Sequence, residues 1–179
     1  EFGVAGTEPE TSFQAFREAR MKPFERPRVA WAQDWVPPNI GWESEKATFR
    51  CYWGQFDFFG KKSDALVLPA VTTGAAYHAE QDWGMDALNV KDTCGLGGAT
   101  LYVNGKAYPV YSPNGQGPIK WSKRLVSETP DNITVELLAE NVGPKDKPYT
   151  VRFTCQALAG RPDSPIQVKL EGGTPSDTL

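Results

Sequence analysis

His78 is the only histidine of the chain and so the only side chain whose ordinary pKa lies near neutrality. In an extended segment, His78, Glu80 and Asp82 would share one face in steps of about 7 Å. A carboxylate beside an imidazole can hold it in one tautomer and raise its basicity, as general-base catalysis requires. The pattern predicts a catalytic base at His78. The alternative is a histidine that only hydrogen-bonds the neighbouring backbone.

Other carboxylates suggest acid chemistry or metal binding. Glu43 lies among aromatic residues, and apolar neighbours raise a carboxyl pKa, so it could be an acid at neutral pH. Capping of the following strand is the alternative for Glu43. Asp82 and Asp86 offer hard oxygen ligands for Ca²⁺, although their spacing matches no compact calcium loop and a solvated acidic loop is the alternative. We expect no cofactor other than this possible Ca²⁺.

Aromatic residues are concentrated between positions 31 and 59. Tryptophan has a flat apolar face and a polar edge, which suits stacking on sugar rings as well as filling a core. We expect at least one tryptophan to line a ligand groove; the alternative is that all of them anchor the core or the lead-in. The candidates for substrate binding are Trp31, Trp35, Trp42, Trp53 and Trp83.

The elements that must position these residues are predicted to be β-strands. Apolar side chains recur at every second residue in 133–137 and 151–155, the period of a half-buried strand. Asn104-Gly105 predicts a tight hairpin, because both residues tolerate the positive φ of a type I′ turn. We therefore predict an all-β fold, an antiparallel β-sandwich. Its strands are expected at 46–53, 66–68, 99–103, 106–110, 119–125, 133–139, 149–157 and 166–170.

We expect one sandwich domain over residues 41–179, preceded by an extended, irregular lead-in over residues 1–40. Four prolines between positions 23 and 38 exclude a long helix there. Residues 1–2 match the dipeptide that a common cloning site encodes, so we exclude them from the fold. Residues 72–98 form a stretch longer than ordinary loops, and such loops are usually functional when ordered.

Composition excludes several classes of partner. With 19 basic and 22 acidic residues the net charge is −3, and no basic stripe is present, so we expect no nucleic acid. No apolar run is long enough for a membrane helix, so we expect no membrane partner. Cys51, Cys94 and Cys155 with one histidine fit no zinc ligand set and are expected to be buried free thiols.

Several stretches between residues 42 and 120 carry a family resemblance. They are 42–50 with Tyr52, 57–62, 77–78 with 82–90, 95–98 and 117–119. In this order they resemble the bacterial domain-of-unknown-function 4861 family. The resemblance implies a galactose-mutarotase-like supersandwich, exported, from systems that degrade acidic, plant or algal polysaccharides. It implies a sugar-handling site around Trp42, Glu43, Tyr77, His78, Asp82 and Asp86.

The chain is shorter than typical members of that family. Either the sandwich is incomplete at its C-terminal end and a second polypeptide completes it, or the chain is a shortened relative. A site that draws residues from a second polypeptide would be only partly visible in this sequence.

Together these features lead us to expect a secreted or periplasmic carbohydrate-active protein that cleaves an acidic, uronate-containing polysaccharide or oligosaccharide. In a lyase, Tyr77 or His78 would remove the proton α to the uronate carboxyl, and Arg50 would neutralise the developing enolate. We favour the lyase because His78 is a ready base.

Two alternatives use other residues. A hydrolase requires two carboxylates, and Glu43 with Asp82 or Asp86 is the available pair. A noncatalytic glycan-binding module would use the tryptophans as a stacking platform. Turnover on a glycan distinguishes the binding module from both enzymes.

Overall fold

A computed structural model describes residues 27–33, 40–68, 77–173 and 179. Within these ranges the regular structure is almost entirely β-strand, with one short 3₁₀ turn, η1 (Pro113–Gly115), and helical backbone at Leu68, which confirms the predicted all-β class. The strands are β1 (Val29–Gln33), β2 (Ile40–Ser44), β3 (Ala47–Tyr52), β4 (Gln55–Lys61), β5 (Gly84–Asp86), β6 (Thr100–Val103), β7 (Lys106–Pro109), β8 (Lys120–Thr129), β9 (Asn132–Val142), β10 (Tyr149–Leu158) and β11 (Ile166–Glu171).

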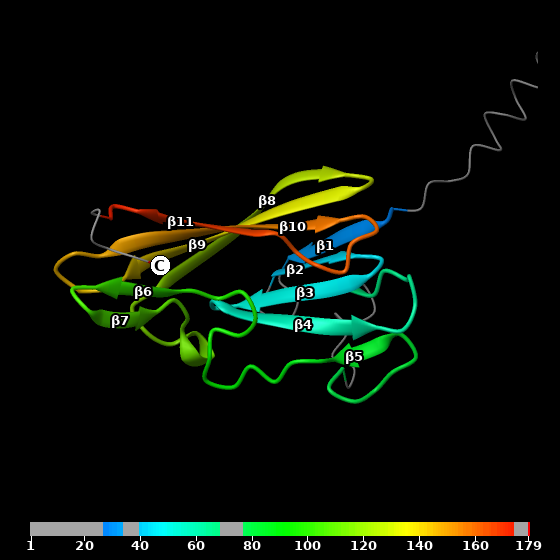
Figure 1. The fold of residues 1–179 in the computed structure, drawn as a ribbon, viewed down its shortest axis with the longest axis horizontal. Helices are drawn as coiled ribbons and strands as arrows, with labels where there is room; N and C mark the ends of the chain where they lie inside the picture. Colours follow the sequence, from blue (N-terminus) through cyan, green and yellow to red (C-terminus); the bar gives the residue numbers. More distant parts are fainter. Residues whose placement is uncertain (1–26, 34–39, 69–76, 174–178) are drawn as a thin grey trace, which may run out of the picture.

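Two antiparallel sheets pack face to face (Figure 1). The first sheet has the order β1-β2-β3-β4-β5, and the second has the order β11-β10-β9-β8. The core between them contains Trp42 and Phe56 from the first sheet and Phe153 from the second. The β6–β7 hairpin closes one end, with Leu101 buried in the same core. The chain is therefore an antiparallel β-sandwich, as predicted; its assignment to the supersandwich class stays a prediction.

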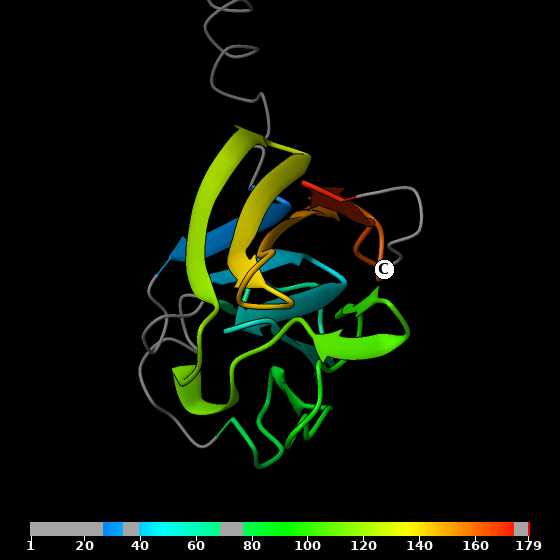
Figure 2. The same ribbon diagram turned by 90° about the vertical axis from the view of Figure 1, so that its left-hand side faces the viewer.

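The first sheet is covered on both faces. Because side chains alternate along a strand, Cys51 and Phe56 face the core, whereas Arg50, Asp57 and Phe59 face the opposite way. We call that opposite side the outer face of the first sheet. The segment that leads from β5 toward β6 lies beneath the first sheet, on the side away from the second sheet (Figure 2). The outer face is consequently a partly buried layer instead of a solvated surface.

Residues 87–96 have little regular structure but are tied to the edge of β4. The Ala87 amide donates to the Phe58 carbonyl over 3.0 Å, and the Phe56 amide donates to the Cys94 carbonyl over 2.9 Å. The Leu96 amide returns a bond of 3.0 Å to the Phe56 carbonyl. These bonds hold a long connection in one conformation.

Two local predictions are confirmed in detail. Val103 pairs with Lys106, and Asn104 and Gly105 have φ values of 51° and 76°, as a type I′ turn requires. The second sheet buries alternate residues of β10, from Tyr149 to Ala157.

All three cysteines are free, with Cys51 and Cys155 buried and Cys94 half-buried.

Other strand predictions were wrong. Residues 29–33, expected in an irregular lead-in, form β1 and pair with β2. The strands β2, β4 and β5 were not predicted. Conversely, residues 66–68 form no strand, because the amides of Val67 and Leu68 bind the Glu43 carboxylate in place of a neighbouring strand.

Candidate functional site

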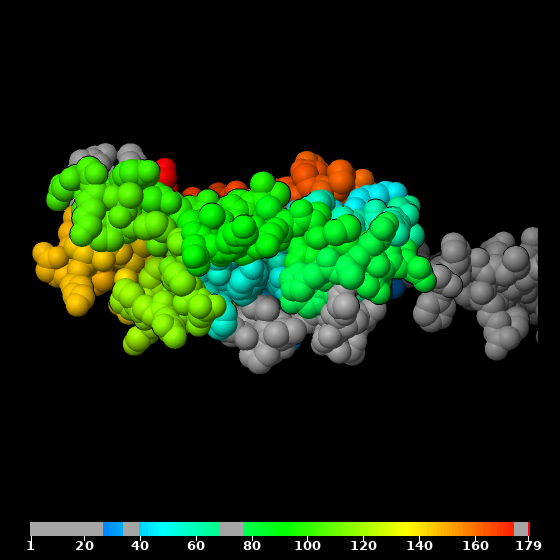
Figure 3. Space-filling model, turned by 90° about the horizontal axis from the view of Figure 1, so that it is seen from below, coloured from blue at the N-terminus to red at the C-terminus, as the bar shows by residue number. Residues whose placement is uncertain are grey.

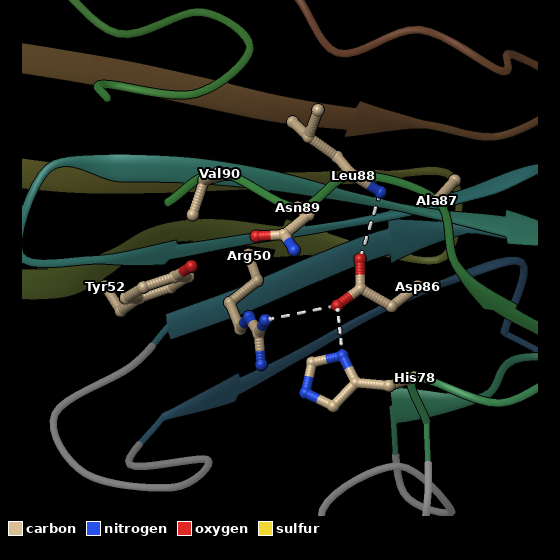
Figure 4. Close-up of a pocket in the computed structure, with 8 residues that line it drawn as sticks. All are labelled: Arg50, Tyr52, His78, Asp86, Ala87, Leu88, Asn89 and Val90. Carbon is tan, nitrogen blue, oxygen red and sulfur yellow. Dashed lines mark hydrogen bonds and ion pairs between the residues drawn. The ribbon is translucent and has the colours of Figure 1, made fainter. Parts of the chain in front are cut away.

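A cavity of about 610 Å³ opens on the outer face of the first sheet. Two of its lining residues, Arg50 and Tyr52, come from β3, and the others come from the end of β5 and the irregular segment around it (Figure 4). Seen from below, green atoms of that segment cover much of this face, with cyan atoms of the first sheet visible between them (Figure 3). The full lining is Arg50, Tyr52, His78, Asp86, Ala87, Leu88, Asn89 and Val90.

An imidazole–carboxylate pair lies at the edge of this cavity. His78 Nδ1 is 3.0 Å from Asp86 Oδ2, and the His78 side chain is 73% exposed whereas that of Asp86 is 6% exposed. The Leu88 amide donates to Asp86 Oδ1 over 3.0 Å, so the carboxylate is held from the protein side. A neutral imidazole that donates from Nδ1 presents Nε2 as a proton acceptor. The pair is therefore arranged as an oriented base (Figure 4).

The carboxylate partner of His78 differs from the one that the sequence predicted. Residues 77–82 form turns and bends in place of an extended strand, so His78, Glu80 and Asp82 do not line up on one face. Glu80 instead pairs with Lys62 over 2.7 Å, and Asp82 is exposed. Asp86 reaches His78 because its amide donates to the Tyr77 carbonyl over 2.8 Å. The turn at Gly84, with φ of 142°, is the local signal for that reversal.

Arg50 provides a buried positive charge beside the pair. Its side chain is 5% exposed; it contacts Asp57, its cross-strand partner, and lies 3.9 Å from Asp86 Oδ2. Its guanidinium also lies 4.8 Å from the ring centroid of Tyr52 and 5.1 Å from that of Tyr77. Burial raises the pKa of Asp57 to about 6; Arg50 opposes this rise and Asp86 adds to it. Arg50 is thus fixed in place by rings and carboxylates.

Two tyrosines flank the site, one of which the sequence did not suggest. Burial raises the pKa of Tyr52 to about 12, so its phenol keeps its proton at neutral pH. Tyr52 was not predicted, although it stands two residues after Arg50 in the strand expected at 46–53, and this spacing puts both side chains on one face. Tyr77, predicted as a possible base, packs its ring 4.3 Å from the His78 ring and 5.9 Å from that of Phe59. It is not among the residues that line the cavity.

The structure places Glu43 and Trp42 away from this cavity. Glu43 is completely buried, and its carboxylate accepts bonds from the Thr48 hydroxyl, the Lys61 ammonium and the amides of Val67 and Leu68. Trp42 is also completely buried, and its indole N–H donates to Ser164 Oγ over 2.8 Å. Neither side chain can reach a substrate in this arrangement, so the expected sugar contacts of Trp42 and the acid role of Glu43 have no structural basis.

The other tryptophans are dispersed. Trp31 on β1 is half-buried and its indole N–H lies 3.3 Å from Glu128 Oε2. Trp83 packs on Phe59 with ring centroids 6.3 Å apart. Trp53 lines a second, smaller cavity on the core side of β3. Trp35 lies outside the described residues, and none of the tryptophans within them lines the cavity beside His78.

Within the described ranges, no three histidine, cysteine, aspartate or glutamate side chains gather as a metal site would require. Asp86 is engaged by His78, Leu88 and Arg50, and Asp82 points to solvent from an exposed turn. Calcium binding by Asp82 and Asp86 stays a prediction.

Fold and site together define an all-β sandwich protein with an Asp–His pair at the edge of a cavity on its outer face. A profile of the family described as a domain of unknown function (DUF4861) matches residues 25–179, and the chain belongs to this family. Comparison with curated proteins and with solved structures gives no match. In the part of the chain that the structure describes, no helix has the length and apolar character needed to cross a membrane.

Proposed function

We propose that the cavity beside His78 is the active site of an exported enzyme that cleaves an acidic, uronate-containing polysaccharide by β-elimination. The observation that carries the proposal is the His78–Asp86 pair, in which a buried carboxylate holds an exposed imidazole over 3.0 Å. Such a pair is the arrangement of a general base. The cavity volume of about 610 Å³ is of the size that accommodates small ligands and short oligomers.

The elimination uses residues that line the cavity. His78 Nε2 takes the proton from the carbon α to the uronate carboxyl, and the released electron pair forms a carbon–carbon double bond. The bond to the glycosidic oxygen on the β carbon breaks, and that oxygen takes a proton from the Tyr52 hydroxyl. Arg50 supplies positive charge near the enolate that develops between these steps. The products are a new chain end and an unsaturated uronate.

The same geometry favours elimination over hydrolysis. A glycoside hydrolase needs two carboxyl groups on opposite sides of the scissile bond. Glu43 is closed off by four donors from its own chain, and Asp86 has both oxygens engaged. The described residues therefore offer an oriented base but no pair of open carboxylates at this cavity.

The test is turnover on a panel of uronate polysaccharides, with polygalacturonate, alginate and hyaluronate as probes. We expect His78→Ala to lower the rate by about 10²- to 10⁴-fold, the range typical of a lost general base. Glu80→Gln is the matched control, because Glu80 lies two residues away and pairs with Lys62 instead of the cavity. We expect the product to absorb as an unsaturated uronate.

Two results would contradict the proposal. They are wild-type turnover by His78→Ala and new reducing ends without the unsaturated product. Retention on a polysaccharide without any turnover would instead support the binding module.

A further inference from the structure

A second cavity, of about 180 Å³, lies on the opposite side of the β3–β4 hairpin. Its walls include the indoles of Trp53 and Trp121, and Cys51 and Leu137 also line it. Cys51 faces the core whereas Tyr52 lines the first cavity, so the two cavities are on opposite faces of β3. This second cavity plays no part in the elimination described above.

The backbone of Trp53 is in a conformation that a bulky residue rarely adopts. Trp53 and Gly54 form the two-residue turn between Tyr52 and Gln55, with φ values of 50° and 85°. The β6–β7 turn has nearly the same values, 51° and 76°, but carries Asn104 and Gly105, the residues that such a turn prefers. A tryptophan in the first position opposes the local preference. An outlier of this kind is a reason to look for a function of the side chain.

Both indoles are fixed before any ligand arrives. The Trp121 indole N–H lies 3.2 Å from Ser112 Oγ, and its ring stacks on Phe153 with centroids 6.3 Å apart. The Ser112 amide donates to the Trp53 carbonyl over 2.8 Å. The Trp53 ring packs so closely on Gly115 that a Cβ there would lie 2.4 Å from the indole. Fixed rings lose little conformational entropy on binding.

The size and charge of the cavity indicate its ligand. A volume of about 180 Å³ corresponds to about six water molecules, which is room for one six-membered ring. The indoles offer apolar faces for the C–H side of a sugar ring, and Ser122 and Lys123 line the same cavity with polar groups. Apolar walls together with the Lys123 side chain that lines them favour an anionic sugar.

We propose that this second cavity binds one uronate ring by stacking on Trp53 and Trp121, as an anchoring site separate from the cavity of His78. The proposal rests on the acidic-glycan class of the proposed function but not on its catalysis. Anchoring of a polymer at a second point would raise its effective concentration at the active site.

The test follows the indole N–H signals of Trp53 and Trp121 by nuclear magnetic resonance during titration with sodium galacturonate and sodium glucuronate. We expect at least one of these salts at millimolar concentration to shift both signals in the wild type and in His78→Ala. Trp53→Asn copies the residues of the β6–β7 turn, so it preserves the hairpin, and we expect it to abolish the shift of Trp121. Lys123→Gln is expected to weaken uronate binding several-fold, with methyl glucoside as the neutral comparison.

Three results would overturn the assignment. They are no shift with either uronate, a Trp121 shift that survives Trp53→Asn, or equal shifts with methyl glucoside. The two proposals fail separately: turnover that depends on His78 without indole shifts removes the anchoring site alone. Indole shifts without turnover remove the enzyme alone.

Discussion

Among the buried carboxylates on the outer side of the first sheet, Glu43 and Asp86 are used differently. Glu43 is wholly enclosed, and its carboxylate accepts hydrogen bonds from a hydroxyl, an ammonium and two amides. Asp86 is nearly as buried, but one of its partners is the exposed imidazole of His78. A buried carboxylate that meets only buried donors organises the fold, whereas one that reaches an exposed imidazole can organise chemistry.

The residues next to Glu43 in the sequence are buried because they also bind distant segments of the chain. Residues 42–45 each bind a distant segment: Trp42 binds Ser164, and the Ser44 hydroxyl donates to the Arg161 carbonyl. The Glu45 carboxylate accepts from the Gly160 amide over 3.0 Å and pairs with Arg28. The segment 42–45 therefore fastens the first sheet to the connection between β10 and β11. We interpret it as structural.

The largest change in stability is expected at Glu43. In Glu43→Gln the buried Lys61 ammonium loses its counter-charge, a change that typically costs about 3–5 kcal/mol. Urea unfolding measures the loss. Glu80→Gln provides the matched control, because the neighbouring Lys62–Glu80 pair is exposed and its removal should leave stability unchanged. A Glu43→Gln protein as stable as Glu80→Gln would contradict the structural role.

Asp57, which contacts Arg50 beside the cavity of His78, should make the stability of the protein depend on pH. Burial raises the pKa of Asp57 from 3.8 to about 6, so the folded state binds this proton more tightly than the unfolded state. The contribution of Asp57 to stability should therefore fall as the pH rises from about 4 to about 6, by at most about 3 kcal/mol. The measurement is the unfolding free energy of the wild type minus that of Asp57→Asn across this interval. A difference that rises with pH would mean that Arg50 outweighs burial.

A smaller effect on stability is expected at Asp86. Asp86→Asn retains an oxygen for the Leu88 amide, and Arg50 keeps Asp57, so we expect a loss of about 1–3 kcal/mol. Turnover on the uronate substrate should fall with it, because the imidazole loses its orienting carboxylate. Thermal unfolding and initial rates measured on the same sample separate the two effects. Destabilisation as large as that of Glu43→Gln would erase the distinction between the two regions.

Local features of the fold were predictable and long-range ones were not. The Asn104-Gly105 turn and the alternation in β9 and β10 depend on neighbouring residues, so the sequence reveals them. The enclosure of the Glu43 carboxylate depends on hydrogen bonds from amides 24 and 25 residues away, which no local sequence pattern reveals. Likewise His78 was recognisable as the only imidazole, but its partner Asp86 depends on the reversal at Gly84. Aromatic neighbours suggested an acid role for Glu43 without revealing that its surroundings are closed.

The most direct test of the Asp86–His78 pair is the tautomer of the imidazole. Because the chain has one histidine, the side-chain ¹⁵N signals of His78 need no assignment. At a pH where the ring is neutral, the account predicts a proton on Nδ1 in the wild type and a shift toward the Nε2-protonated form in Asp86→Asn. A wild-type ring protonated on Nε2 would contradict the account, because the nitrogen that faces the cavity could then accept no proton.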